Sequence, residues 1–95
     1  MNLDPMPYQQ AQHALVELKT AVLRFLEAKG KKGARNVQVG RSLGIYAGHI
    51  GHVGHIPRTL LALLEAEGVV RQDVGTKKWF LRKDEELEKD KEETD

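Results

Sequence analysis

Residues 57–70, PRTLLALLEAEGVV, constrain the fold more than any other stretch of this chain. The leucines recur at the spacing of one helical face, and Gly68 is the type of residue that ends a helix. The segment that follows, VVRQDV, is rich in β-branched residues and favours a strand. We therefore expect a helix that starts at Pro57, as its first helical residue, and passes directly into a strand.

Two earlier segments are also expected to be helical. Residues 8–29 follow the start signal Asp4-Pro5 and end before Gly30. Their apolar face holds Leu15, Leu18, Val22, Phe25 and Leu26. A shorter helix is expected from Asn36, which can cap it, through Val39 to Gly44. In the third helix the apolar stripe is expected to hold Leu60, Leu61, Leu63 and Leu64.

The strand segments VVRQDV and WFLR are expected to form a hairpin around a turn at residues 75–78. Alternation places Trp79 and Leu81 on the core face, opposite Val69 or Val70. Three helices and a hairpin in 95 residues predict a single α+β domain.

Charge is distributed unevenly along the chain. Residues 1–83 carry thirteen Lys and Arg against six Asp and Glu, a net of +7, and residues 84–95 carry eight acids and two lysines, a net of −6. We therefore divide the chain into a basic domain, 1–83, and an acidic tail, 84–95, which is expected to be disordered. The basic domain should attract polyanions, and the tail should partly screen it.

The segment from Val39 to Val70 has the pattern of a helix-turn-helix. In VGRSLGI, the small Gly40 lets the next helix cross closely, and Gly44 takes the positive backbone angle that ends a helix. IPRTLLALLEAEGVV resembles the recognition helix and first strand of winged helix-turn-helix proteins, where a Ser-Arg-x-Leu-x-x-Leu-Glu-x-x-Gly-Leu-Val string is frequent. The matching residues are Leu61, Leu64, Glu65, Gly68, Val69 and Val70, whereas Arg58 and Thr59 stand in place of the Ser-Arg pair.

This resemblance spans about residues 10–83 and implies a three-helix winged helix-turn-helix with the hairpin as its wing. It also implies binding of double-stranded DNA by a transcriptional regulator or accessory factor of prokaryotic or viral type. The third helix would enter the major groove and the wing would lie along the backbone or in the minor groove. By position, Arg58 and Thr59 would face the groove. The residues that would contact phosphate are Arg35, Arg41, Lys77 and Lys78, with Lys31 and Lys32 as further candidates.

The connection before the third helix is unusually long. Ile45 and Ile56 are eleven residues apart, whereas a typical turn of this motif has three or four residues, so about six look inserted. The insertion lies within residues 47–57, AGHIGHVGHIP, where three of the four histidines occur. His52 and His55 are expected to contact DNA. His49, His52 and His55 are also weak candidates for a metal site, because the chain has no cysteine to supply a fourth ligand.

Other functional classes have less support in the sequence. The Gly-His stretch lacks the lysine-hydroxyl pair of a phosphate-binding loop, and no catalytic grouping stands out, so we expect neither enzyme activity nor a cofactor. A cytoplasmic location without a membrane partner is expected, because no apolar run spans a bilayer and the N-terminus lacks a signal-peptide pattern.

Two alternatives to a DNA-binding regulator stay open. One is a protein-interaction module of a larger complex, and the other is a metal-responsive regulator that uses the histidines. A homodimer is also considered, since the first helix is long, although its one clear apolar face is needed for the core.

Overall fold

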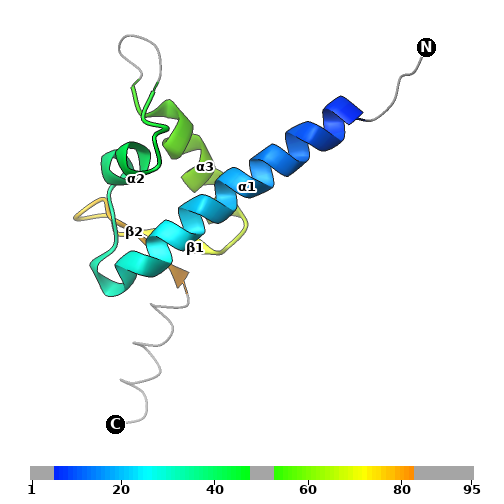
Figure 1. Cartoon of the computed structure of the whole chain (residues 1–95). Helices are drawn as coiled ribbons and strands as arrows, with labels where there is room; N and C mark the ends of the chain where they lie inside the picture. The colour runs from blue at the N-terminus through cyan, green and yellow to red at the C-terminus, as the bar shows by residue number, and fades with distance from the viewer. Residues whose placement is uncertain (1–5, 48–52, 83–95) are drawn as a thin grey trace.

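The computed structural model describes residues 6–47 and 53–82. Along this part of the chain it has helix α1 (Met6–Lys29), a 3₁₀ turn η1 (Gly30–Lys32), helix α2 (Asn36–Ser42), helix α3 (His55–Ala66) and strands β1 (Val70–Gln72) and β2 (Trp79–Leu81). The described part is an α+β fold with three α-helices and a two-stranded antiparallel sheet, as Figure 1 shows. This arrangement is compatible with a winged helix.

The hydrophobic core lies where the three helices meet the hairpin. Val22 and Leu26 of α1 are completely buried, as is Leu61 of α3. Helix α2 and both strands add at least one side chain each to the same cluster, which also includes Ala34, Val39, Leu60, Leu64, Val70, Trp79 and Leu81. Burial of each large apolar side chain contributes roughly 1.5–3 kcal/mol, so this cluster holds α2, α3 and the hairpin in place.

The hairpin pairs Val70 with Leu81 and Gln72 with Trp79. The predicted alternation is confirmed, because Val70, Trp79 and Leu81 are buried. The sequence did not predict one further pairing, a bridge from Ala34 to Trp79. The Ala34 N–H donates to the Trp79 carbonyl at 3.1 Å, and the Trp79 N–H donates to the Ala34 carbonyl at 2.7 Å. The segment before α2 is thereby attached to the edge of the sheet.

The junction of α2 and α3 depends on two glycines, as predicted. A Cβ atom on Gly40 would lie 2.7 Å from Tyr46 Cδ1 and 2.9 Å from Pro57 Cγ, so only glycine allows this close crossing. Gly44 has the predicted positive φ, +72°. The connection from α2 to α3 covers residues 43–54, which confirms that it is longer than a typical turn of three or four residues.

The predicted start of α3 is wrong. The helix begins at His55, so Pro57 is its third residue and not its first. The proline is tolerated there because the first N–H groups of a helix have no acceptor within the helix. Leu63 was expected in the apolar stripe, but its side chain is 38 % exposed, since it projects away from the buried Leu60, Leu61 and Leu64.

The predicted cap of α2 is also wrong. Asn36 is the first residue of the helix, and Arg35 is its N-cap. Gln38 Oε1 accepts a hydrogen bond from the Arg35 N–H at 3.0 Å, which satisfies the exposed donor at this end. The side chain of Asn36 is used elsewhere, because its Nδ2 donates to the Gly54 carbonyl at 3.2 Å and so connects α2 to the start of α3.

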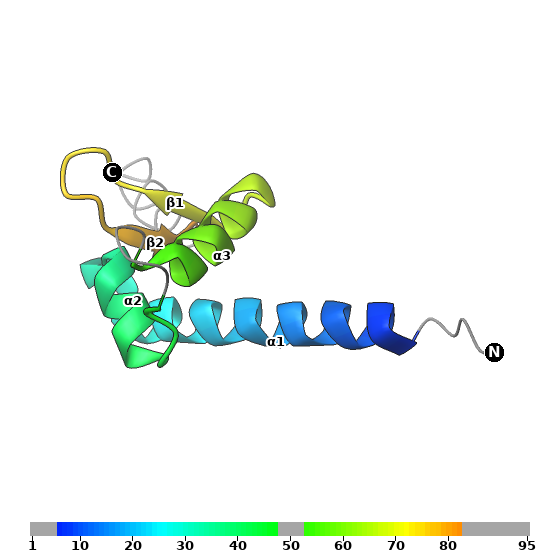
Figure 2. The same cartoon turned by 90° about the horizontal axis from the view of Figure 1, so that it is seen from above.

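Helix α1 is longer than the body on which it packs. Its N-terminal part extends away from the other helices and the hairpin, as Figure 2 shows. All side chains from residue 6 to 14 are exposed, and Leu18 is 37 % exposed. The predicted core face of α1 is confirmed for Val22 and Leu26, which are buried, and for Leu15 and Phe25, which pack against the core, so that Leu18 is its one exposed member. Asp4, Pro5 and the tail 84–95 lie outside the described residues.

Candidate nucleic-acid interface

Four lysines meet at a pocket between η1 and the hairpin. Lys29, the last residue of α1, lines it together with Lys31 and Lys32 of η1, and Lys78 lines it from the hairpin. We call these four residues the lysine cluster. The other lining residues are Gly33, Gln38, Asp73, Thr76 and Phe80. Cations gathered in one concavity raise the local potential and attract anions.

Gly33 brings the two sides of this pocket together. It has a positive φ of +65°, and a Cβ at this position would lie 2.5 Å from the ring of Phe80. The backbone after η1 therefore lies directly against that ring. Arg71 is paired with Phe80 across the two strands, and its guanidinium carbon is 4.8 Å from the centroid of the Phe80 ring. Stacking of this kind holds the ring in place beneath the lysine cluster.

Asp73 is the one acidic residue among those that line this pocket, and its carboxylate is used to shape the hairpin loop. Its Oδ2 accepts the backbone N–H of Thr76 at 2.7 Å and the Thr76 hydroxyl at 2.8 Å. These bonds, the backbone one first, lower the pKa of Asp73 from its usual 3.8, with a smaller contribution from the charge of Arg71. The Asp73 carboxylate thus orders the loop that carries Lys77 and Lys78.

Lys77 occupies an unusual backbone position at the tip of this loop. Its φ is +66°, which glycine adopts much more readily than lysine. Two hydrogen bonds hold it there: its N–H donates to the Asp73 carbonyl at 2.8 Å, and its carbonyl accepts from Gln72 Nε2 at 3.1 Å. The side chain itself is exposed. A cation is therefore presented where backbone conformation alone favours glycine.

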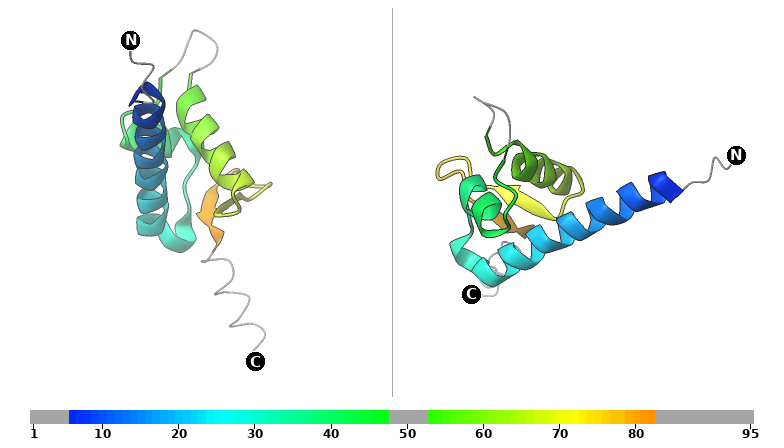
Figure 3. Two further views of the ribbon diagram at one scale, coloured as in Figure 1. Left: turned by 90° about the vertical axis from the view of Figure 1, so that its right-hand side faces the viewer. Right: turned by 45° about the horizontal axis from the view of Figure 1, so that its top comes forward.

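The hairpin loop, the start of α2 and the start of α3 lie at one edge of the molecule. Arg35 Nε donates to the Thr76 carbonyl at 3.2 Å, which joins α2 to the loop. Asn36 then joins α2 to Gly54, the residue before α3. Figure 3 shows the loop beside α2. Of the predicted site residues, Arg35, Lys31, Lys32 and Lys78 are brought together here.

The predicted residues at the α2–α3 junction form a separate group. The Arg41 guanidinium lies over the ring of Tyr46, with its carbon 5.4 Å from the centroid. Arg58 Nη2 donates weakly to the Val53 carbonyl at 3.4 Å, so this guanidinium turns back toward the chain that enters α3. Thr59 and His55 are exposed on α3. None of these contacts joins this group to the lysine cluster directly.

The outer face of α3 has little charge. Arg58 and Glu65 are the only formally charged residues in the helix, and Ala62 and Ala66 are exposed. Val53, Ile56 and Leu63 are 46 %, 40 % and 38 % exposed, and Ile56 and Leu63 are seven residues apart on one helical face. This face offers small and apolar side chains to whatever contacts it.

The metal site stays a prediction. His49 and His52 lie outside the described residues, and so does the predicted DNA contact of His52. Within residues 6–47 and 53–82, no three His, Cys, Asp or Glu side chains group as metal ligands would.

Sequence reasoning predicted three of the nine residues that line this pocket as site residues, namely Lys31, Lys32 and Lys78. The other six are Lys29, Gly33, Gln38, Asp73, Thr76 and Phe80. The detectable signal was the positive φ expected of Gly30, found here at +55°, because such a glycine turns the chain sharply and places the last helical residue beside those that follow.

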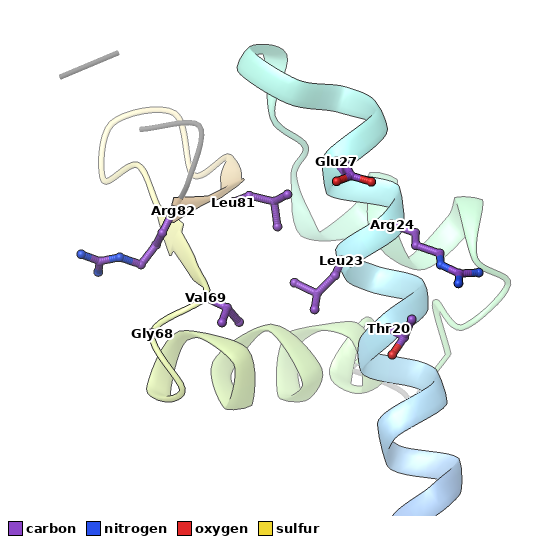
Figure 4. Close-up of a pocket in the computed structure, with 8 residues that line it drawn as sticks. All are labelled: Thr20, Leu23, Arg24, Glu27, Gly68, Val69, Leu81 and Arg82. Carbon is purple, nitrogen blue, oxygen red and sulfur yellow. The ribbon is translucent and has the colours of Figure 1, made fainter. Parts of the chain in front are cut away.

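A second pocket lies on the opposite side of the hairpin, between α1 and the residues that follow α3. Figure 4 shows Leu23, Val69 and Leu81 pointing into it, while Arg24 and Arg82 point away. Its remaining lining residues are Thr20, Glu27 and Gly68. The lining combines apolar side chains with one hydroxyl, one carboxylate and two arginines, and it includes no His, Ser or Cys.

No helix in the described ranges is both long and apolar enough to cross a membrane. Comparison with known proteins finds no family model, no curated protein and no solved structure that matches this chain. The function proposed next therefore depends on the geometry and charge of the chain itself.

Proposed function

We propose that this chain is a winged helix-turn-helix protein that binds double-stranded DNA, mainly through its phosphates, as a regulator or accessory factor. The observation that carries the proposal is the lysine cluster at the edge where the hairpin loop meets the start of α2. Phosphate contacts in DNA complexes come from Lys and Arg side chains on such loops and helix starts. The α+β architecture, with its hairpin after the third helix, agrees with this family.

The two groups of basic residues are expected to contribute differently. The lysine cluster and Lys77 supply non-directional attraction to phosphate, which gives affinity and salt dependence. On α3, Arg58 and Thr59 are the candidates for base contacts, while Ala62 permits close approach to a groove. Because the face of α3 has one cation and few hydrogen-bond donors, we propose weak sequence preference.

The test is a titration of the full chain with random-sequence duplex DNA at several salt concentrations. The logarithm of the binding constant should fall linearly with the logarithm of salt, and each lost phosphate contact should reduce the slope by about 0.9. The variants Lys31→Ala and Lys78→Ala should both show this reduction. Arg24→Gln removes one charge from the exposed side of α1 and should leave the slope unchanged. A chain that fails to bind duplex DNA at low salt contradicts the proposal.

Lys77 allows a test in which stability and binding change in opposite directions. Lys77→Gly removes a left-handed lysine, so the free energy of unfolding should stay the same or rise by up to about 1 kcal/mol. DNA affinity should nevertheless fall, with a lower salt slope. Denaturant unfolding and the same DNA titration measure the two quantities. If affinity is unchanged, Lys77 is only a solvated turn residue.

A protein-interaction module is the second candidate, and exposed apolar residues on α3 and just before it favour it. Val53, Ile56 and Leu63 present side chains that a protein partner would cover. The variant Ile56→Ala/Leu63→Ala retains every lysine and arginine. If duplex DNA binding at low salt is absent in wild type, the apolar face of α3 becomes the main candidate interface, and this variant is the one to examine against protein partners.

A further inference from the structure

The N-terminal part of α1, residues 6–14, is exposed and carries no formal charge. Residues 5–16 contain no Asp, Glu, Lys or Arg, although such residues make up 31 % of the chain. Met6 and Tyr8 are 64 % and 68 % exposed. Figure 2 shows this part of α1 extending well past the body. An exposed helix without charges, in a chain so rich in them, has the composition of the centre of an interface.

The apolar residues of this segment follow a heptad spacing. Tyr8, Ala11, Leu15 and Leu18 succeed one another at intervals of three, four and three residues, and Val22 continues the series into the core. We call Tyr8, Ala11, Leu15 and Leu18 the arm seam. Its Tyr8 and Ala11 are exposed, its Leu18 is partly exposed, and its Leu15 already packs against the edge of the core. The face of α1 that the body covers at Val22 is therefore exposed to solvent toward the N-terminus of the helix.

We propose that the arm seam packs against the arm seam of a second copy of this chain, with the two α1 helices antiparallel. The position of the body selects this orientation. From Val22 onward the seam side of α1 is covered by α3 and the hairpin, so a parallel partner would bring its own body against them. In an antiparallel pair the two bodies lie at opposite ends, and a two-fold axis relates the chains.

The antiparallel register pairs side chains of complementary size. Centred on residue 13, it sets Ala11 against the partner's Leu15 and Tyr8 against the partner's Leu18. The residues that flank the seam are Pro7, Gln12, Ala14 and Lys19, and the register sets Lys19 opposite the partner's Pro7, so no like charges face each other across the axis. A neutral seam suits a second copy, because residues near a two-fold axis face their own copies, so a charge there would meet its own sign.

The association is measured on the full chain without DNA, by sedimentation equilibrium. Four layers form a small interface, so we expect dimers with a dissociation constant on the order of 10–100 µM. Ala11→Glu places a charge in the seam and should weaken association at least tenfold. Gln10→Glu adds the same charge one residue away, on the outer side of the helix, and should change association less than about twofold. Both positions are exposed, and circular dichroism checks that both variants fold.

The orientation is measured with a spin label on Arg24→Cys, since the chain has no other cysteine. In the antiparallel register the two labels are offset along the helices by 22 residues, about 33 Å at the rise of an α-helix. A parallel pair would bring them to about one helix-to-helix spacing, near 10 Å before label length. The longer distance supports the proposal.

Three outcomes overturn this proposal: a chain that stays monomeric at concentrations well above the expected constant, equal effects of Ala11→Glu and Gln10→Glu, or the short label distance. Capture of a different protein by the arm of a monomeric chain would likewise overturn it. Because DNA is absent from each assay, the result is independent of whether the chain binds DNA.

Discussion

Gly40 lies where helix α2, Tyr46 and Pro57 meet. Alanine is normally the better residue inside a helix, by roughly 0.5–1 kcal/mol over glycine. Here the added methyl group would lie 2.7 Å from the Tyr46 ring and 2.8 Å from its Cβ, so the ring or α3 would have to move. The local preference and the tertiary contact therefore act in opposite directions at this residue.

Gly40→Ala should lower the free energy of unfolding by about 1–3 kcal/mol, because overpacking outweighs the gain in helix propensity. Urea denaturation, followed by the fluorescence of the single buried tryptophan, Trp79, measures the change. The matched control is Gly75→Ala, where the nearest atom to a new Cβ is Asp73 Oδ2 at an ordinary 3.5 Å. Stabilisation by Gly40→Ala would show that the two helices are not packed as closely as described.

At the scale of the element, the hairpin loop has a pH dependence of its own. The pKa of Asp73 is lowered by hydrogen bonds from the Thr76 N–H and hydroxyl. A carboxyl whose pKa is lower in the folded chain stabilises the loop above its unfolded pKa, near 3.9, and loses this contribution as pH falls through its folded pKa. The loop should therefore stay ordered at neutral pH and loosen only in strong acid.

An NMR titration of the Asp73 carboxyl should give a midpoint below 3.8. Thr76→Val keeps the backbone donor and removes the hydroxyl, so the midpoint should rise while staying lowered in part. Thr59→Val alters a threonine on α3 and should leave the midpoint unchanged. A wild-type midpoint at or above 3.8 would mean that the carboxylate does not hold the loop in solution.

Local patterns predicted the elements better than their contacts. Two kinds of feature are encoded within a few residues, and the structure confirms both. They are the glycines that end the helices, at Gly30, Gly44 and Gly68, and the alternation in the hairpin. The start of α3 was wrong because the long connection before it has no strong helix-start signal. The Ala34–Trp79 bridge joins residues 45 apart, and no local pattern reports such a pair.

For the candidate site, too, the sequence predicted local features better than contacts between distant residues. Clustered lysines at 31–32 and 77–78 were visible in the sequence, but their meeting at one pocket depends on Gly33 lying against Phe80. The groove contact of Arg58 stays a prediction from the family pattern, and the sequence did not predict that its guanidinium donates to the Val53 carbonyl. The direction of the Arg58 side chain depends on the connection before α3, and no short-range sequence pattern predicts the conformation of that connection.

At the scale of the whole molecule, the lysine cluster and the uncharged part of α1 lie at different ends. The lysine cluster lies at the end of the body where α1 stops, whereas the neutral arm begins at the other end of the same helix. Salt should therefore weaken attraction to polyanions while leaving the association of two arms almost unchanged.

The exposed arm also makes the helical length of α1 depend on the concentration of the chain. A helical end that lies beyond the body has little to hold it against melting, because short helices in water are marginal without packing. Ellipticity at 222 nm per residue should then increase as the chain is concentrated, and it should stay flat for Ala11→Glu. Flat behaviour in wild type would mean that the arm is helical by itself. If the increase is seen, the N-terminal turns of α1 form only when two chains associate, so that dilution alone shortens this helix.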